Sequence, residues 1–264
     1  MDDRPIGIID SGIGGISILN EVRKYLPCEN YIYYADSINN PYGNKPKEEI
    51  IKIVDNIIKY FIKYNVKIVI IACNTASTQT ISYLRNNYKD ILFVAVEPAI
   101  KVAYDKYKDK NVLVMATPGT IHSDRLMSLA KEYYQKNRIL LPCTNLAELI
   151  ENENLEEIPI YLDNLFKNID YNQIEVVILG CTHYPFIKKY IENALNHKVI
   201  FVDGANGVKK RVEFLLQENN IFNNKNNQGT LTIILTKKET ENIIRNYLVN
   251  NSNVCFKYKD KSSI

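Results

Sequence analysis

The chain has 264 residues, enough for one large domain or two small ones, and its 46% apolar and 24% charged residues are typical of globular proteins. The formal net charge is only +3 and the lysines are scattered among acidic residues and asparagines, so no nucleic-acid partner is expected. No apolar run reaches the ~18 residues of a membrane span and no signal peptide is recognisable, so we expect a cytoplasmic protein without a membrane partner.

Short apolar runs alternate with amphipathic stretches along most of the chain, which predicts β-α units around parallel sheets. The predicted strands, in chain order, are PIGIID, YIYYAD, KIVIIA, LFVAVE, NVLVMA, RILLP, VVILG, VIFVD, TLTIIL and NVCFKY. Helical patterns lie between them. In EEIIKIVDNIIKYFIKY, for example, apolar residues recur every three or four positions.

The first eight predicted strands form two similar sets of four. IGIID resembles VLVMA, IYYAD resembles ILLPC, VIIAC resembles VILGC, and VAVEP resembles IFVDG, each at an offset of 106 to 108 residues. Four matches in the same order at a nearly constant offset indicate an internal duplication. The sequence therefore predicts two similar α/β domains with parallel sheets and an active site in the cleft between them.

The domain limits follow from this repeat. The first domain is predicted to comprise residues 1–97 together with 207–264, because the C-terminal segment has no counterpart in the second unit. The second domain is predicted to comprise residues 98–206. The chain would then cross between the domains twice, and paired crossings form a natural hinge.

Ligands of open parallel sheets bind beyond the carboxyl ends of the strands, so residues that follow each strand are candidates for a site. Two strand ends carry a cysteine, Cys73 in IIACNTAST and Cys181 in ILGCTHYPF. Each precedes a predicted helix whose free amides would lower the pKa of a thiol toward neutrality or bind a substrate carboxylate. We expect one thiol on each wall of a shared cleft.

The five cysteines are odd in number and widely spaced, which suits neither a disulfide framework nor a zinc site, and no metal is expected. Cys181 and His183 could form the nucleophile pair of a hydrolase, but such pairs are usually far apart in sequence, and Cys73 would be unexplained. His183 is interpreted as a partner of Cys181 or of a carboxylate, with a hydrogen-bonded core histidine as the simpler alternative. The other cysteines are interpreted as structural: Cys28, Cys143 and Cys255.

The glycine-rich stretch DSGIGGIS could be a phosphate loop. It lacks the GxxxxGK pattern, and Ser17 stands where the dinucleotide fingerprint has its third glycine, although Asp36 stands where a ribose-binding acid would. Asp10 would also repel an incoming pyrophosphate. A tight turn that begins a helix is therefore favoured over a nucleotide-binding oxidoreductase.

Two thiols across a cleft suit one type of chemistry particularly well. A nucleophile needs one group, whereas inversion at a carbon stereocentre needs one group to remove a proton from one face and another to return a proton to the opposite face. A duplicated fold supplies two such groups. Cys73 and Cys181 are thus the expected acid/base pair.

The sequence also resembles the aspartate/glutamate racemase family along nearly its whole length. The segments that carry the resemblance are IGIIDSGIGG, YYADS, NPYG, ACNTAS, VEPAIK, ATPGT and LGCTHYP. The resemblance implies a two-domain fold with its active site between the domains and no cofactor. It also implies interconversion of L- and D-glutamate, which provides D-glutamate for peptidoglycan and hence for cell-wall biogenesis and cell shape.

Carried over by position, the resemblance implies that Cys73 and Cys181 are the catalytic acid/bases, with Asp10 assisting Cys73 and His183 assisting Cys181. In the segment before Glu151, Cys143-Thr144 stands where the family usually has a Cys-Pro pair. The implied substrate contacts are Asp10, Ser11, Tyr42, Gly43, Asn74, Thr75, Glu151, Thr182 and His183.

The sequence therefore predicts a cofactor-independent racemase whose partner is a small-molecule substrate, glutamate. In the family, a histidine at the position of His183 goes with glutamate, whereas the aspartate branch tends to carry an acid. An aspartate or broad-specificity amino-acid racemase, a nucleotide-binding oxidoreductase and a non-catalytic amino-acid-binding protein stay open as alternatives. The oligomeric state is open as well, with a homodimer among the candidates.

Overall fold

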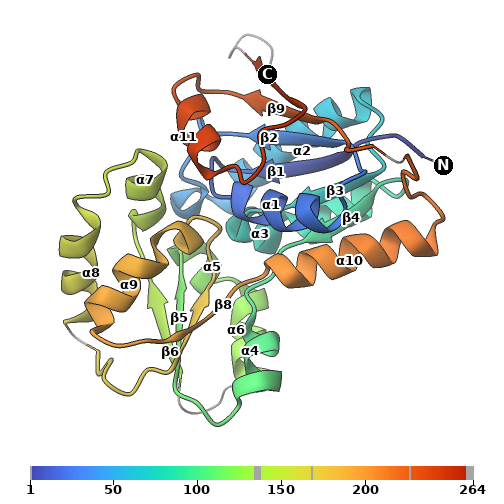
Figure 1. Ribbon diagram of the computed structural model, residues 1–264. Helices are drawn as coiled ribbons and strands as arrows, with labels where there is room; N and C mark the ends of the chain where they lie inside the picture. Colours follow the sequence, from blue (N-terminus) through green and yellow to red (C-terminus); the bar gives the residue numbers. More distant parts are fainter. Residues whose placement is uncertain (1, 134–137, 168, 226, 260–264) are drawn as a thin grey trace.

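The computed structural model describes residues 2–133, 138–167, 169–225 and 227–259, which form two units, each around its own sheet (Figure 1). All pairings in both sheets are parallel. The first sheet has the order β10-β9-β2-β1-β3-β4. Its strands are β1 (Ile6–Asp10), β2 (Tyr31–Ala35), β3 (Ile68–Ile71), β4 (Leu92–Ala95), β9 (Leu231–Leu235) and β10 (Val254–Tyr258).

The second sheet repeats the central part of the first. Its order is β6-β5-β7-β8, which corresponds strand by strand to β2-β1-β3-β4. Its strands are β5 (Val112–Ala116), β6 (Arg138–Pro142), β7 (Val176–Leu179) and β8 (Ile200–Val202). The predicted fold class, two duplicated α/β units with parallel sheets, is confirmed.

Helices cover both faces of the first sheet, which explains why its strands are continuous apolar runs. Ile8 faces one helical layer and Ile9 faces the other, because neighbouring side chains of a strand point to opposite faces. The layer beside Ile8 consists of α1 (Ile16–Tyr25), α10 (Ala205–Glu218) and α11 (Thr240–Tyr247). The opposite layer consists of α2 (Lys47–Lys63) and α3 (Asn74–Asn87).

The second sheet is covered in the same way. One face carries α4 (Ile100–Tyr107), α5 (Pro118–Ile121) and α6 (Asp124–Tyr133). The other carries α7 (Leu146–Glu151), α8 (Ile158–Phe166), the 3-10 helix η2 (Tyr184–Ile187) and α9 (Lys188–Leu195). A further 3-10 helix, η1 (Tyr42–Asn44), belongs to the first unit and faces α5.

The chain passes between the units after β4 and again after β8. A Cβ atom placed on Gly204 would lie 2.5 Å from Val96 Cγ2 and 2.9 Å from the carbonyl oxygen of Glu97, so the two crossings run side by side. A side chain larger than hydrogen has no room there. The predicted domain limits, 1–97 with 207–264 and 98–206, stay a prediction.

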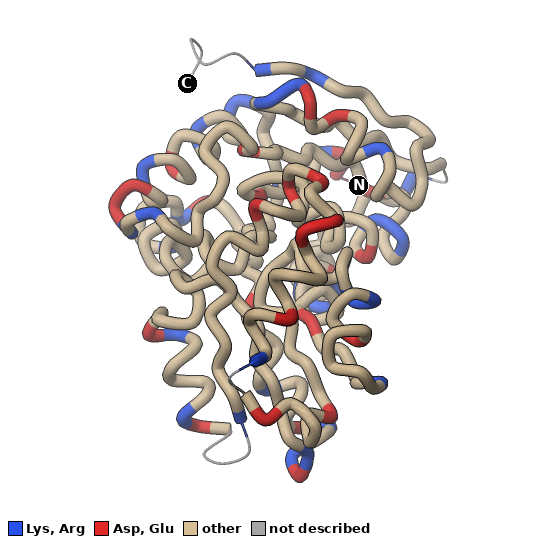
Figure 2. The backbone as a smooth tube through the Cα atoms, turned by 90° about the vertical axis from the view of Figure 1, so that its left-hand side faces the viewer, with Lys and Arg blue, Asp and Glu red and all other residues tan. Residues whose placement is uncertain are grey.

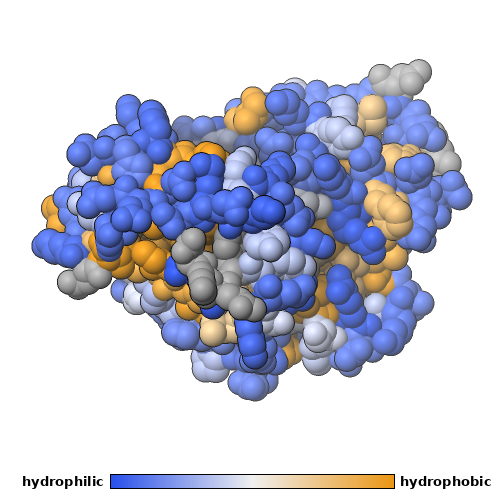
Figure 3. Space-filling view, turned by 90° about the horizontal axis from the view of Figure 1, so that it is seen from below, coloured by the Kyte–Doolittle hydropathy of each residue, from blue (hydrophilic) through white to orange (hydrophobic). Residues whose placement is uncertain are grey.

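The surface carries charges of both signs. Lysine and arginine alternate with aspartate and glutamate around the outside of the molecule (Figure 2). The face seen from the side of the second unit is mostly hydrophilic, with smaller apolar groups between (Figure 3). In the described part of the chain, no helix combines the length and the apolar composition needed to cross a membrane.

Candidate active site

The carboxyl ends of β1 and β3 bring the first group of predicted site residues together. Ile9 pairs with Ile71 in the sheet, so both strands end at the same edge. Ser11 follows β1, and Cys73 follows β3 as the N-cap residue of α3. This edge faces the corresponding edge of the second sheet, where β7 is followed by Cys181.

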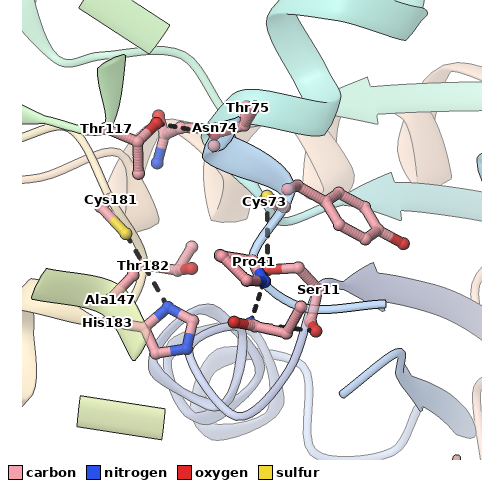
Figure 4. Close-up of a pocket in the computed structure, with 13 residues that line it drawn as sticks. Ser11, Pro41, Cys73, Asn74, Thr75, Thr117, Ala147, Cys181, Thr182 and His183 are labelled. Carbon is pink, nitrogen blue, oxygen red and sulfur yellow. Dashed lines mark hydrogen bonds between the residues drawn. The ribbon is translucent and has the colours of Figure 1, made fainter. Parts of the chain in front are cut away.

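A small cavity of about 20 Å³ lies between the two edges (Figure 4). It has room for about one water, which needs ~10–15 Å³. Most of the predicted site residues line it, whereas Asp10 and Glu151 lie behind the lining and bond to residues in it. The lining residues are Ser11, Asn40, Pro41, Tyr42, Gly43, Cys73, Asn74, Thr75, Thr117, Ala147, Cys181, Thr182 and His183.

The two thiols stand on opposite sides of this cavity, as Figure 4 shows. Cys73 Sγ lies 3.8 Å from Ser11 Oγ. Cys181 Sγ lies 3.8 Å from His183 Nδ1. Both contacts are within hydrogen-bonding range for sulfur, so each thiol has its own polar partner.

The expected lowering of the thiol pKa at a helix N-terminus is not found at Cys73. Burial, together with the charge of Asp10, raises the pKa of Cys73 to about 12. The thiol loses its solvation and faces a negative charge, which outweighs the helix. The expected helix after Cys181 also differs, because a 3-10 turn over Tyr184–Ile187 precedes α9, which begins at Lys188.

Asp10 joins the two units behind the cavity. Its carboxylate accepts hydrogen bonds from the backbone amide of Gly12 at 3.0 Å and from Thr182 Oγ1 of the second unit at 3.0 Å. Burial raises the pKa of Asp10 to about 6, although the charge of His183 and the two donors oppose the shift. Asp10 bonds to Thr182 rather than to Cys73, so it acts on that thiol through its charge.

Glu151, the last residue of α7, is the second connection between the units. It contacts His183 Nε2 at 2.6 Å and accepts hydrogen bonds from Ser37 Oγ at 2.7 Å and from the backbone amide of Ile13 at 2.9 Å. Burial alone would lower the pKa of His183, but its contacts with Cys181 and Glu151 outweigh burial and raise it well above the usual range. A protonated imidazole is therefore favoured next to Cys181. Glu151 reaches the cavity through His183 rather than directly.

The glycine-rich loop is shaped by these two side chains. A Cβ atom on Gly12 would lie 2.2 Å from Glu151 Oε2, and one on Gly14 would lie 2.4 Å from His183 Nδ1. Only glycine leaves space for them. The space that a nucleotide phosphate would need beside these glycines is filled by the second unit, which argues against the dinucleotide-binding alternative.

The lining also includes residues that were not among the predicted substrate contacts: Asn40, Pro41, Thr117 and Ala147. Thr117 was a strand-end candidate, because it follows β5 just as Ser11 follows β1. Its Oγ1 lies 2.8 Å from Thr75 Oγ1 across the cleft (Figure 4). Ser37 was a strand-end candidate because it follows β2, but it was not assigned to the substrate site, and its contact with Glu151 shows its role.

Asn74 lines the cavity and carries an unused acceptor. Its Oδ1 is buried and has no hydrogen-bond partner among the described residues. A buried oxygen without a donor is costly, so a bound ammonium or amide would satisfy it. Among the described residues, no group of three or more His, Cys, Asp or Glu side chains could hold a metal ion.

Comparison with known proteins gives a consistent result. The family described as Asp/Glu/Hydantoin racemase matches residues 19–206. The chain is similar to the glutamate racemase of Clostridium botulinum, at 40% identity over 88% of this chain and 91% of the relative, and to that of Clostridium kluyveri, at 41% identity with the same coverage. The fold is similar to that of a glutamate racemase of Bacillus anthracis, with a TM-score of 0.87 and 25% identity over 100% of both chains.

A second solved structure holds a ligand. The glutamate racemase of Francisella tularensis, in complex with D-glutamate, matches with a TM-score of 0.79 and 28% identity over 97% of this chain and 98% of that one.

Proposed function

The chain belongs to the Asp/Glu/Hydantoin racemase family, and from this we propose that it interconverts L- and D-glutamate by proton transfer between two thiols, without a cofactor. The observation that carries the proposal is the position of Cys73 and Cys181 on opposite sides of one buried cavity. A substrate held between them presents one face of its α-carbon to each thiol. Neither thiol could invert the centre alone.

In this mechanism one cysteine starts as a thiolate and the other as a thiol. For L-glutamate, Cys181 removes the α-proton and Cys73 delivers its proton to the opposite face; D-glutamate reacts in reverse. The raised pKa of Cys73 means that the substrate-free site holds it as a thiol, ready to deliver a proton. His183 Nδ1, beside Cys181 Sγ, can hold or return the proton of the second thiol.

The negative charge that develops on the substrate during proton removal needs hydrogen-bond donors. Asn74 and Thr75 lie in the first turn of α3, where backbone N–H groups have no partner within the helix. Thr182 and His183 approach from the second unit. We assign the α-carboxylate to these donors and the ammonium group to the free oxygen of Asn74, because donors aimed at the developing charge lower the barrier.

Glutamate rather than aspartate is the proposed substrate. Aspartate has a shorter side chain than glutamate, so the donors that bind the distal carboxylate of glutamate would stay buried and unpaired. Buried donors without a partner are costly. We further propose that the enzyme works in the cytoplasm, where thiols stay reduced, and that its D-glutamate supplies peptidoglycan synthesis. An aspartate or broad-specificity racemase is the alternative, and it would show an equal or higher kcat/KM with aspartate.

The test is racemisation of L-glutamate by the purified protein without added cofactor, followed by circular dichroism. Cys73→Ser and Cys181→Ser should each lower kcat by about 100-fold or more, the usual contribution of a general acid or base. Cys143→Ser is the matched control, because Cys143 is buried but does not line the cavity. Equal losses in all three variants, or no racemisation by the wild type, would contradict the proposal.

A further inference from the structure

A second cavity lies at the same edge of the first sheet, beyond the carboxyl end of β2. Its volume is about 300 Å³, at the lower end of the range for small-molecule sites. It is enclosed by the end of β2, the loop that follows, helix α2 and the residue after β10. The lining residues are Tyr34, Asp36, Ile38, Asn39, Ile53, Asn56, Ile57 and Lys259.

Lys259 supplies a positive charge, and the charged side chains that act on it are Asp36 and Lys63. Its Nζ lies 5.4 Å from the ring centre of Tyr34 and 4.5 Å from that of Tyr60. No hydrogen bond or ion pair joins this ammonium group to any other residue in the part of the chain that the structure describes. Aromatic faces hold a cation in place but leave its N–H donors unused. Lys259 is therefore positioned to bind an anionic group in the cavity.

Asp36 supplies the opposite charge at the inner wall. Only 1% of its surface is exposed, and its carboxylate accepts hydrogen bonds from Tyr42 OH at 2.6 Å and from Asn39 Nδ2 at 2.9 Å. A carboxylate has about four acceptor positions, so it can accept a further donor. Burial raises the pKa of Asp36 to about 6, so near neutral pH it is mostly ionised and gains from an added positive charge.

We propose that this cavity is a second binding site, specific for a small zwitterion whose carboxylate contacts Lys259 and whose ammonium group contacts Asp36. Ile53 and Ile57 supply an apolar surface for the methylene groups between the two charges. A lone anion such as phosphate would be repelled by Asp36, and a lone cation by Lys259. A zwitterion satisfies both groups.

The second site is connected to the first through one hydrogen bond. Asp36 lines the second cavity, Tyr42 lines the first, and Tyr42 OH donates to Asp36. An ammonium group on Asp36 weakens its bond with Tyr42, which is a predicted substrate contact. Occupancy of the second site should therefore change KM for glutamate, and glutamate should change the affinity of the second site by the same factor.

Binding is tested directly with β-alanine, a zwitterion without an α-stereocentre, by isothermal titration calorimetry. Acetate and methylammonium, which carry one charge each, should bind at least tenfold more weakly. Lys259→Met should weaken β-alanine binding about tenfold or more, since a hydrogen bond to a charged group is lost. Lys257→Met is the matched control, because Lys257 lies in β10, two residues before Lys259, and its ammonium group lies over the ring of Tyr64, outside the cavity.

The outcomes separate this site from the active site. Asp36→Asn, with thermal unfolding as a check on folding, should weaken binding like Lys259→Met, while Ser11→Ala should leave it intact. The effect of β-alanine on KM should disappear in Lys259→Met. Binding that survives Lys259→Met but is lost in Ser11→Ala, or no binding to the wild type, would overturn the proposal. Calorimetry does not depend on turnover, so it tests binding at the second site independently of racemase activity.

Discussion

At the level of single residues, the two cysteines are chemically similar but sit in different surroundings. Cys73 contacts a hydroxyl group and is exposed to the charge of Asp10, whereas Cys181 contacts an imidazole that is held by Glu151. We therefore expect the two proposed half-reactions to use different supporting groups. In the proposed mechanism, each thiol reaches only one face of the α-carbon.

This division predicts a stereochemical result. Cys73→Ala should lose racemisation in both directions but should still eliminate HX from the L-form of a glutamate analogue with a β-leaving group, because elimination needs only one proton removal. Cys181→Ala should act only on the D-form. The measurement is keto-acid formation from each enantiomer. Equal rates with both enantiomers in either variant would refute the placement of one catalytic thiol on each side of the cavity.

Asp36 predicts a pH-dependent stability. Its pKa is raised from 3.8 to about 6 in the folded state, so its contribution to stability is fully present below pH 3.8 and is lost as pH rises through 6. Asp36→Asn should lack this loss. Between pH 4 and 7.5 its free energy of unfolding, measured with urea, should gain about 2 kcal/mol relative to the wild type.

Asp55 is the control for this experiment, because its pKa is shifted in the opposite direction. The pKa of Asp55 is lowered: burial opposes the shift, but hydrogen bonds from Lys59 and Tyr88 outweigh it. Its contribution is present above the unfolded pKa and is lost as pH falls, so Asp55→Asn should fall further below the wild type as pH rises. The same direction of change in both variants would mean that the burial of Asp36 does not govern its titration.

At the level of elements, the strands and their order along the chain could be predicted from the sequence, since buried parallel strands are continuous apolar runs. The strand ends then gave Asp10, Ser11, Cys73 and Cys181. The network around Glu151 could not be predicted, because its partners Ser37 and Ile13 belong to the other unit and nothing in their local sequence indicates a contact more than a hundred residues away.

The glycine-rich loop gives a prediction at this scale. Gly14→Ala would place a methyl group only 2.4 Å from His183 Nδ1, so we expect that the units cannot close fully around the substrate. We expect kcat to fall at least 100-fold, because misplaced catalytic groups lose their effective concentration. The loss should be measured in steady-state assays alongside thermal unfolding.

Gly207→Ala is the control for the glycine prediction. No atom lies within 4 Å of a Cβ placed on Gly207, which is inside helix α10. Alanine should therefore stabilise the protein by about 0.5–1 kcal/mol and leave kcat unchanged. A similar loss of kcat in both variants would show that the loop before α1 has no special steric role.

At the level of the whole molecule, glutamate is several times larger than the small cavity, so we expect the two units to move apart during each cycle. The adjacent crossings beside Gly204 are the natural hinge. Asn44 Nδ2 of the first unit donates to Asn145 Oδ1 of the second at 3.2 Å, which provides a place to test this motion.

A cross-link at this position should stop the enzyme. In a background with Cys28 and Cys255 replaced by serine, Asn44→Cys with Asn145→Cys, joined by a disulfide or a short bis-maleimide, should lower kcat at least tenfold. Reduction of the disulfide should restore it, and each single variant should remain active. Full activity of the cross-linked protein, with the link verified by mass spectrometry, would show that substrate exchange needs no opening here.

The size of the small cavity also determines how such an enzyme can be inhibited. A molecule selected for its fit to a space of about 20 Å³ would be no larger than a solvent molecule, so the closed form is a poor template for drug design. A competitive inhibitor must instead recognise the separated units. A glutamate derivative with a bulky substituent directed at Glu151 would keep Ser37 and Ile13 from reaching that carboxylate. Its potency would come from preventing closure as much as from resembling the substrate.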